Sequence, residues 1–475
     1  MRHFSRCCGA LALTAAILSG CGASPATPVE PTHITVWSYY NGDQLTAFNE
    51  LVDEFNATVG AEKGIYVDSA SQGTVADLAK NVMAAATGEA GAEALPDIFA
   101  AYADTAYQLD QLGCVADLDD YLTDEEAAQY VTSYLDEGRF NQTGMKIFPV
   151  AKSVEILVLN ETDWAPFAAA TGTDMADLTT IEGVTAAAEA YYNWTDGQTP
   201  EPNDGKALYG RDAMANYIFS GAMQLGTNLL TQEDGKVTLH FDEAVIRQLW
   251  DNYYVPFVKG YFAASGRFRS DDLKTGNIIA CVSSSSSATY LPDTVATSDT
   301  ESHPIALKIL PCPQFTGGSP CAIQQGAGMV VTQQGDERVA CSVEFLKWFT
   351  DASRNIRFSV DSGYLPVMKA ANDMAAIRTG GSQLTDLMDE VLTVSVDTVN
   401  DNLLYTPTAF ANSDTVRNTL EYCLSDQAEA DRAEVLTALQ AGKDLETATA
   451  AFTGDQHFAE WYENTLEQLQ TAIQH

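Results

Sequence analysis

Residues 34–67 read ITVWSYYNGDQLTAFNELVDEFNATVGAEKGIYV, and this stretch decides the fold. Its first four residues are all β-branched or aromatic, and none of them favours a turn. This pattern predicts a strand, which Asn41-Gly42 ends. Apolar residues then recur at helical spacing over residues 45–55, and residues 65–67 form a second apolar run. A strand, a helix and a strand in succession predict a βαβ unit with parallel strands and a right-handed crossover.

The alternation of strands and helices continues to about residue 120. Leu78 and Val82 indicate a further helix, and residues 96–99 begin a third strand. A helix near residues 105–112 ends at Gly113, a suitable C-cap. The opening part of the chain therefore predicts a doubly wound α/β lobe.

The rest of the chain predicts a second set of strands and a mostly helical end. Residues 154–159 form a continuous apolar strand that only Glu155 interrupts. No internal repeat is visible, and the one low-complexity run is Ser283–Ser287. The other expected strands cover residues 277–282, 305–310 and 328–331, and the expected helices cover residues 179–194, 213–225, 242–254 and 339–349 and most of the chain from 384 to its last helix at 458–473.

The charge balance is strongly acidic. The chain has 475 residues, with 65 Asp and Glu against 25 Lys and Arg, and a formal net charge of −40. Such a surface repels phosphate backbones, so we expect no nucleic-acid partner. A hydrophobic fraction of 46% is enough for sizeable cores, and the length suggests two or three domains.

The N-terminus predicts export and anchoring. Residues 1–20 combine a basic start with a short apolar run, and small residues precede Cys21, which resembles a bacterial lipoprotein signal. An ordinary secretory signal is the alternative. Residues 21–31 then form a Pro-rich tether behind a lipidated Cys21, and no later apolar run approaches the ~20 residues of a membrane-spanning helix. We expect an extracytoplasmic protein held by lipid at the outer face of the cell membrane.

Six cysteines would remain in the mature chain besides Cys21. Cys312 and Cys321 flank a Gly-Gly-Ser-Pro loop and are the best candidates for a disulfide, whereas a set of buried free thiols is the alternative. The six are Cys114, Cys281, Cys312, Cys321, Cys341 and Cys423.

Motifs of common catalytic and metal sites are missing from the sequence. There is no G-x-S-x-G elbow, S-x-x-K or phosphate loop, and the six His are not at zinc-ligand spacing. Two Asp-Gly loops, at residues 195–197 and 203–205, do not match the EF-hand pattern. We therefore expect no metal, no cofactor and no enzymatic activity, although a glycosidase would need only two carboxylates.

Five segments, in this order, resemble the extracellular solute-binding lipoproteins of bacterial ABC importers, which take up sugars and similar polar solutes. The resemblance covers nearly all of the mature chain and implies a periplasmic-binding-protein type II-like α/β fold, with two doubly wound lobes joined by crossing hinge segments. It divides the chain into an N-terminal lobe (32–153 plus 327–363) and a C-terminal lobe (154–326 plus 364–475). The segments are residues 34–56, 95–99, 148–160, 343–350 and 362–367.

Within that family, the pattern is similar to the branch that binds glycerol phosphate. Residues 277–285 resemble its strand with a Ser-rich turn, residues 322–328 its Gly-containing loop, and Arg417 an arginine near its C-terminus. Tyr39 departs from the pattern, because a His is typical there, and Lys152-Ser153 replaces a Ser-rich pair. These departures leave open whether the ligand carries phosphate.

The expected site lies at the strand ends, where open α/β sheets bind ligands. Hydroxyls of a sugar need carboxylates or amides, and its C–H face needs aromatic rings. Glu155 in an apolar strand would either face the ligand or pair with Lys152. The full set of expected ligand-binding residues, of which Arg211, Tyr217, Tyr364 and Arg417 rest mainly on the resemblance, is Tyr39, Tyr40, Asp43, Asp104, Thr105, Lys152, Ser153, Glu155, Arg211, Tyr217, Ser284, Ser285, Ser286, Gln325, Gly326, Tyr364 and Arg417.

The mechanism that the resemblance implies is closure of two lobes on a carbohydrate or related polyol, followed by docking on a membrane permease. We expect hinges near residues 153–155, 325–328 and 363–365, and a monomer. A surface glycan-processing enzyme and a sensory lipoprotein that binds solute without import are the alternatives.

Overall fold

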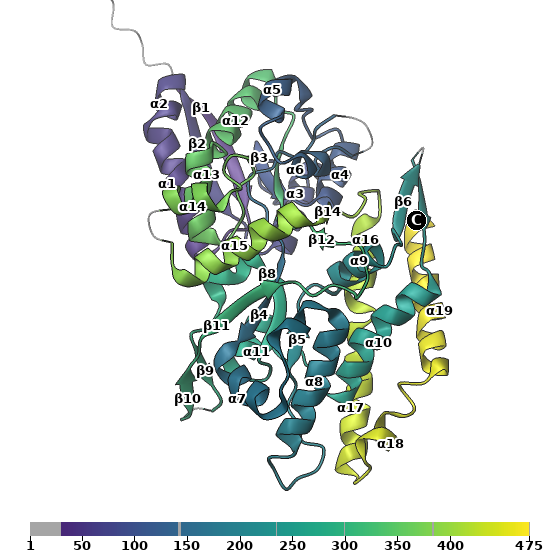
Figure 1. Cartoon of the computed structure of the whole chain (residues 1–475). Coiled ribbons are helices and arrows are strands. Elements are labelled where there is room, and N and C mark those ends of the chain that lie inside the picture. The colour runs from purple at the N-terminus through teal and green to yellow at the C-terminus, as the bar shows by residue number, and fades with distance from the viewer. Residues whose placement is uncertain (1–29, 141–143, 234, 299, 382–383, 475) are drawn as a thin grey trace, which may run out of the picture.

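The computed structural model describes residues 30–140, 144–233, 235–298, 300–381 and 384–474 (Figure 1). The predicted signal, residues 1–20, and Cys21 lie outside the described residues. Figure 1 shows two α/β lobes, one above the other, with the C-terminal helices α16 to α19 along the side of the lower lobe. The α/β fold with two lobes and a mostly helical C-terminal part is confirmed.

The first lobe is built on the predicted βαβ unit. Its strands β1 and β2 are parallel, with Thr32 opposite Ile65, and β3 joins β1 on the other side, also in parallel. A capping box between Thr74 and Asp77 starts α3, because each side chain accepts from a backbone N–H that the first turn leaves free. The elements are β1 (Thr32–Ser38), α1 (Gly42–Ala57), α2 (Val59–Lys63), β2 (Ile65–Ser71), α3 (Val75–Thr87), β3 (Ile98–Ala101), α4 (Ala103–Gln111), the 3-10 helix η1 (Asp119–Tyr121), α5 (Asp124–Ala127) and α6 (Thr132–Glu137).

A distant part of the chain completes this lobe. Strand β13 (Gly328–Val331) pairs antiparallel with β3, so the sheet order is β13-β3-β1-β2. Helices α12 (Asp336–Phe349) and α13 (Ala352–Ser362) follow and pack on α1 and β1, adding Phe345, Phe349 and Phe358 to the core around Phe48.

The second lobe has a mixed sheet of order β11-β4-β8-β5. Strand β4 is antiparallel to β8 and β11, whereas β5 and β8 are parallel. The chain enters through β4, so this strand runs away from the first lobe and the other three run back toward it. The elements are β4 (Glu155–Asn160), α7 (Glu161–Thr171), η2 (Met175–Thr179), α8 (Ile181–Asp196), β5 (Tyr209–Arg211), α9 (Met214–Gln224), β6 (Leu230–Glu233), β7 (Lys236–Leu239), α10 (Glu243–Lys259), α11 (Arg269–Thr275), β8 (Ala280–Ser284), η3 (Ser285–Tyr290), β9 (Thr294–Ala296), β10 (Ser302–Pro304), β11 (Leu307–Pro311) and β12 (Cys321–Ile323).

Both faces of β4 are buried, which explains its continuous apolar sequence. Leu157 and Leu159 contribute to the main core of the second lobe, and Ile156 and Val158 face a third core. That third core also takes side chains from α13 and α15, so it lies where the two lobes meet. The C-terminal elements are α14 (Met374–Gly380), α15 (Asp386–Asp401), β14 (Leu403–Tyr405), α16 (Ser413–Tyr422), α17 (Ser425–Gln440), α18 (Leu445–Thr449) and α19 (Asp455–Gln474).

Three segments cross between the lobes side by side. Backbone bridges join Lys152 to Leu365 and Ser153 to Gln325, both antiparallel. The lobe boundaries expected at 153/154, 326/327 and 363/364 stay a prediction, and just beyond the last of them Met368 still forms a backbone bridge with Tyr130 of the first lobe. Motion about the crossing segments stays a prediction as well.

The six cysteines within the described residues are free thiols, so Cys312 and Cys321 are not joined in this structure. Among the described residues, no helix combines the length and the apolar character needed to span a membrane.

Candidate functional site

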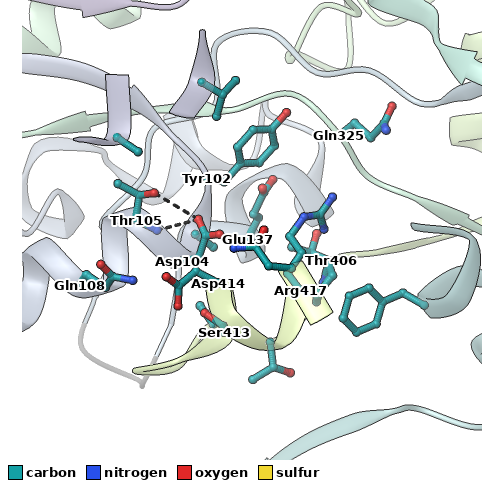
Figure 2. Close-up of a pocket in the computed structure, with 18 of the residues that line it drawn as sticks. Tyr102, Asp104, Thr105, Gln108, Glu137, Gln325, Thr406, Ser413, Asp414 and Arg417 are labelled. Carbon is teal, nitrogen blue, oxygen red and sulfur yellow. Dashed lines mark hydrogen bonds between the residues drawn. The ribbon is translucent and has the colours of Figure 1, made fainter. Parts of the chain in front are cut away.

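A cavity of about 500 Å³ lies between the two lobes (Figure 2). Its first-lobe wall comes from α3, α4 and the end of α6, and its second-lobe wall from α9, the segment after β12, the segment after β14, and α16. Both walls carry polar and apolar residues. The polar and charged residues that line it are Lys80, Tyr102, Asp104, Thr105, Gln108, Glu137, Asn216, Gln324, Gln325, Thr406, Thr408, Ser413, Asp414, Arg417 and Asn418.

The first-lobe wall follows from the end of β3. The chain leaves this strand at Ala101 and places Tyr102 and Asp104 at the start of α4, which is the carboxyl edge of parallel strands. One oxygen of Asp104 accepts from the backbone N–H of Thr105 at 2.6 Å. Burial raises the pKa of Tyr102 above its ordinary value, so this phenol, which is neutral at pH 7 in any case, stays a hydrogen-bond donor at alkaline pH as well.

The second-lobe wall is centred on Arg417. This residue lies on α16, and its Nη2 donates to Oδ1 of Asn216 on α9 at 2.9 Å. In the described parts of the chain Arg417 makes that single hydrogen bond and no ion pair within 4 Å. Four of the five guanidinium N–H groups therefore have no hydrogen-bond partner among the described residues. Figure 2 shows the guanidinium extending toward Glu137 and Gln325.

One crossing segment reaches the cavity through Gln324 and Gln325, and Glu137 of the cavity wall contacts a second crossing segment. The ammonium group of Lys152 pairs with Glu137, and both side chains are almost fully buried, with exposed fractions of 1% and 6%. The same ammonium group donates to the carbonyl of Gly326, and Gln324 donates its amide N–H to Glu137. Ligand contacts at Glu137 would thus reach the segments that join the lobes.

Two buried amide oxygens of the cavity have no hydrogen-bond partner among the described residues. They are Oε1 of Gln324 and Oε1 of Gln325, and Gln324 as a whole is only 5% exposed. A buried acceptor without a donor is costly. Asp104 and Asp414 add carboxylate acceptors to the lining of the cavity, which suits a solute that brings hydroxyl donors.

The structure distributes the seventeen expected residues over four places. Asp104, Thr105, Gln325 and Arg417 line the cavity. Tyr39, Lys152, Ser153, Gly326, Tyr364, Ser284, Ser285 and Ser286 lie at or beside the crossing segments. Tyr40, Glu155, Arg211 and Tyr217 are buried in the lobes, and Asp43 is exposed beside a separate surface depression.

Glu155 does not pair with Lys152. It is the first residue of β4, and β5 ends at the same edge of the sheet, which brings Arg211 to both carboxylate oxygens at 2.9 Å. Lys152 instead reaches Glu137 of the first lobe. The guanidinium of Arg211 also lies 5.0 Å from the ring centre of Tyr217. Glu155 is only 4% exposed, and its negative charge is neutralised by Arg211 within the second lobe.

The serine run makes contacts between the lobes. Ser284 donates to Ser153, and Gln44 of α1 donates to the carbonyl of Ser286 at 2.9 Å. Tyr39 lies near the same joint, where its hydroxyl contacts that of Tyr364 at 3.4 Å and accepts from the backbone N–H of Ala327. Burial raises the pKa of Tyr39 well above its usual value. These residues position the crossing segments beside the cavity.

Sequence reasoning missed several cavity residues. Tyr102 lies two residues before the predicted Asp104, and Asp414 lies one helical turn before Arg417. Both could have been predicted from their position beside an expected site residue. Glu137, Asn216 and Gln324 gave no signal, because they enter the cavity only through tertiary packing.

Comparison with known proteins identifies the family. Residues 50–382 match the family described as bacterial extracellular solute-binding protein, which is more than half of the chain. This chain belongs to that family. A search of curated protein sequences finds no match.

Solved structures with the fold of this solute-binding protein are numerous. A cyclic alpha-maltosyl-1,6-maltose binding protein from Arthrobacter globiformis has a TM-score of 0.67 at 17% identity, and covers 93% of this chain and 99% of its own. UgpB from Mycobacterium tuberculosis in complex with glycerophosphocholine has a TM-score of 0.66 at 19% identity, covering 94% and 98%. A Thermus thermophilus maltotriose binding protein has a TM-score of 0.60 at 15% identity, covering 93% and 100%. Because all three sequence identities are below 25%, these similarities establish the fold of this chain and not its ligand.

Proposed function

We propose that this protein is the solute-binding component of an ABC importer, which captures a carbohydrate or related polyol between its lobes and delivers it to a membrane permease. The observation that carries the proposal is the cavity of about 500 Å³ whose walls come from both lobes and the crossing segments. A solute that contacts both walls favours the closed arrangement, because it interacts with the closed form more than with the open one.

The chemistry of the cavity supports a polyhydroxyl solute. Asp104 and Asp414 supply carboxylate acceptors, and Phe219 and Tyr102 offer ring surface for C–H groups. Arg417 adds donors that suit a ring or glycosidic oxygen as well as a phosphate. The similar structures described above include a cyclic alpha-maltosyl-1,6-maltose binding protein, a maltotriose binding protein, and UgpB in complex with glycerophosphocholine.

The signal and Cys21 support attachment to the membrane by lipid, with the mature chain on the outer face of the cell membrane. The mature protein would act as a monomer, because a single cavity between two lobes of one chain supplies all the contacts described here. No chemical step is assigned to it, since its role is to bind and release. Incorporation of labelled palmitate into the wild type but not into Cys21→Ala tests the lipid attachment.

A thermal-shift screen of the mature protein tests the function. The panel should contain maltotriose, cyclic maltose derivatives, cycloalternan, glycerophosphocholine and glycerol 3-phosphate, with lysine as a charged control. We expect at least one carbohydrate or polyol to raise the melting temperature and to reduce the radius of gyration in solution scattering. A compound that binds without any change of shape, or a glycan that is cleaved on incubation, would contradict the proposal.

A further inference from the structure

We propose that Asn216 is a positioning residue, which fixes the guanidinium of Arg417 in the cavity and ties it to the buried Glu155–Arg211 ion pair. This deepens the proposed function, and its effect on affinity rests on that function. Its effect on Arg417 itself does not, so the two can be tested apart.

The four side chains of Arg211, Glu155, Asn216 and Arg417 form a continuous hydrogen-bonded line. Arg211 donates to both oxygens of Glu155 at 2.9 Å, and Nδ2 of Asn216 donates to Oε1 of Glu155 at 3.3 Å. Oδ1 of Asn216 then accepts from Nη2 of Arg417 at 2.9 Å. The line starts at residues that are 4–6% exposed and ends at the cavity, and Asn216 in its middle is 1% exposed.

The orientation of the Asn216 amide follows from its two neighbours. The carboxylate of Glu155 only accepts hydrogen bonds, and the guanidinium of Arg417 only donates them. The amide must therefore turn its NH₂ group to Glu155 and its oxygen to Arg417. A flipped amide would place two donors together and two acceptors together in a buried site. The Glu155–Arg211 pair thus sets the direction of the acceptor that Arg417 meets.

A second contact holds the backbone of Arg417 in register with Asn216. Glu421, one turn further along α16, accepts from the backbone N–H groups of Met214 and Ala215 at 3.1 and 2.9 Å. It replaces a side-chain cap, because α9 begins after Ala213, whose φ of 54° is unusual for a residue other than glycine and which has no capping side chain. These two hydrogen bonds hold helix α16 on α9, so the remaining variable is the rotamer of the long Arg417 side chain.

Asn216 removes that freedom before a ligand arrives. An arginine side chain has many rotamers, and ordering it on binding weakens affinity. A guanidinium already held by one N–H loses less entropy when its other donors contact a solute. We expect loss of the Asn216 contact to weaken binding by about three- to tenfold, which is the effect of ordering one long side chain.

Asn216→Leu is the test variant, and Ser220→Ala is its matched control. Leucine keeps the size of the side chain and leaves Glu155 paired with Arg211. Ser220 lies one turn further along the same helix, is 8% exposed, and donates to the backbone carbonyl of Asn216 rather than to its side chain. Both variants remove a buried polar group from α9, but only one removes the partner of Arg417.

The first measurement needs no ligand. In protein labelled with ¹⁵N-arginine, hindered rotation should give Arg417 separate Nη signals, assigned by their absence from Arg417→Lys. We expect these signals to merge in Asn216→Leu and to stay separate in Ser220→Ala. Unchanged Arg417 signals in Asn216→Leu would overturn the proposal, whether or not the protein binds a sugar.

The second measurement uses maltotriose and glycerophosphocholine in titration calorimetry. For a probe that binds the wild type, Asn216→Leu should lower the affinity three- to tenfold, and should add nothing in an Arg417→Gln background. An equal loss in both backgrounds would show that Asn216 does not act through Arg417. If neither probe binds, the proposed function fails for these solutes, and the arginine signals still decide the role of Asn216.

Discussion

Lys152 and Glu137 form a buried ion pair that joins a crossing segment to the wall of the cavity. Lys152 lies where the chain passes from the first lobe to the second, and Glu137 ends helix α6 beside the cavity. The carbonyl of Gly326, in the second crossing segment, accepts from the same ammonium group. One charged group therefore holds two crossing segments and one cavity residue together.

Breaking this pair should destabilise the protein strongly. Lys152→Met leaves a buried carboxylate without its cation, which costs about 3–5 kcal/mol in comparable sites. We expect urea unfolding to show a loss of that size, and Lys152→Met/Glu137→Gln to recover part of it. Lys63→Met is the control, because the Lys63–Glu344 pair has side chains that are 50% and 35% exposed, and should cost less than about 1 kcal/mol. Equal small losses at both sites would contradict the role given to Lys152.

The crossing segment at Gly326 should not tolerate a side chain. Gly326 has a φ of 87°, and a Cβ there would lie 2.7 Å from the carbonyl oxygen of Ala151. Gly317 has a φ of 74° but nothing within 4 Å of such a Cβ. Gly317→Ala should therefore cost only the left-handed strain, about 1–2 kcal/mol, and Gly326→Ala clearly more. Thermal unfolding of the two variants decides this, and equal melting temperatures would show that the contact at Ala151 relaxes freely.

Variants of Asp104 and Asp43 test whether the solute binds in the cavity between the lobes. Both lie in the first turn of a helix of the first lobe, but Asp104 lines the cavity and Asp43 does not. Asp104→Asn should weaken the binding of a polyol found by the thermal-shift screen by about tenfold or more, because a hydrogen bond to a charged group contributes about 1.5–3 kcal/mol. Asp43→Asn should leave the affinity unchanged. Calorimetric titration with the same compound measures both, and the reverse order would place the solute at the surface depression near Asp43.

Alkaline pH should destabilise the fold. Burial raises the pKa of Cys321 to about 11 and that of Tyr191 to about 12, from ordinary values of 9.0 and 10.0. Above about pH 9 the unfolded chain releases these protons while the folded chain keeps them, so the free energy of unfolding falls as pH rises toward 11–12. The raised pKa of each group corresponds to at most about 2.7 kcal/mol of stability.

The melting temperature measured from pH 8 to pH 11.5 checks this expectation. Tyr191→Phe should make the loss less steep, because it removes one of the groups that ionises only on unfolding. Tyr66→Phe is a suitable control, since Tyr66 is 41% exposed. A melting temperature that stays constant up to pH 11 would show that these groups ionise without unfolding.

The strands and helices that the sequence predicted well are those with a local cause. The βαβ unit at residues 32–71 follows from a change of hydrophobic period within one stretch of chain, and its strands pair in parallel as expected. The helix expected to end at residue 254 continues to Lys259, because Pro256 is tolerated near its C-terminal end, where it breaks few hydrogen bonds.

The partners of Glu155 could not be predicted in this way. Lys152 is near in sequence, but in extended chain a separation of three residues places side chains on opposite faces. Arg211 is far in sequence, and it reaches Glu155 because β8 lies between β4 and β5 in the sheet. Strand order is a property of the whole fold, so it cannot be predicted from the hydrophobic periodicity of one segment.

The far origin of β13 has a consequence for how the molecule is made. Residues 328–331 form the edge of the first sheet, so a ribosome must have translated more than three hundred residues before β3 acquires its outer neighbour. A nascent chain that stops earlier presents β3 as an open edge, which can recruit another copy. Truncation before residue 328 should therefore give an aggregating fragment, and a helper that shields β3 during synthesis would protect it.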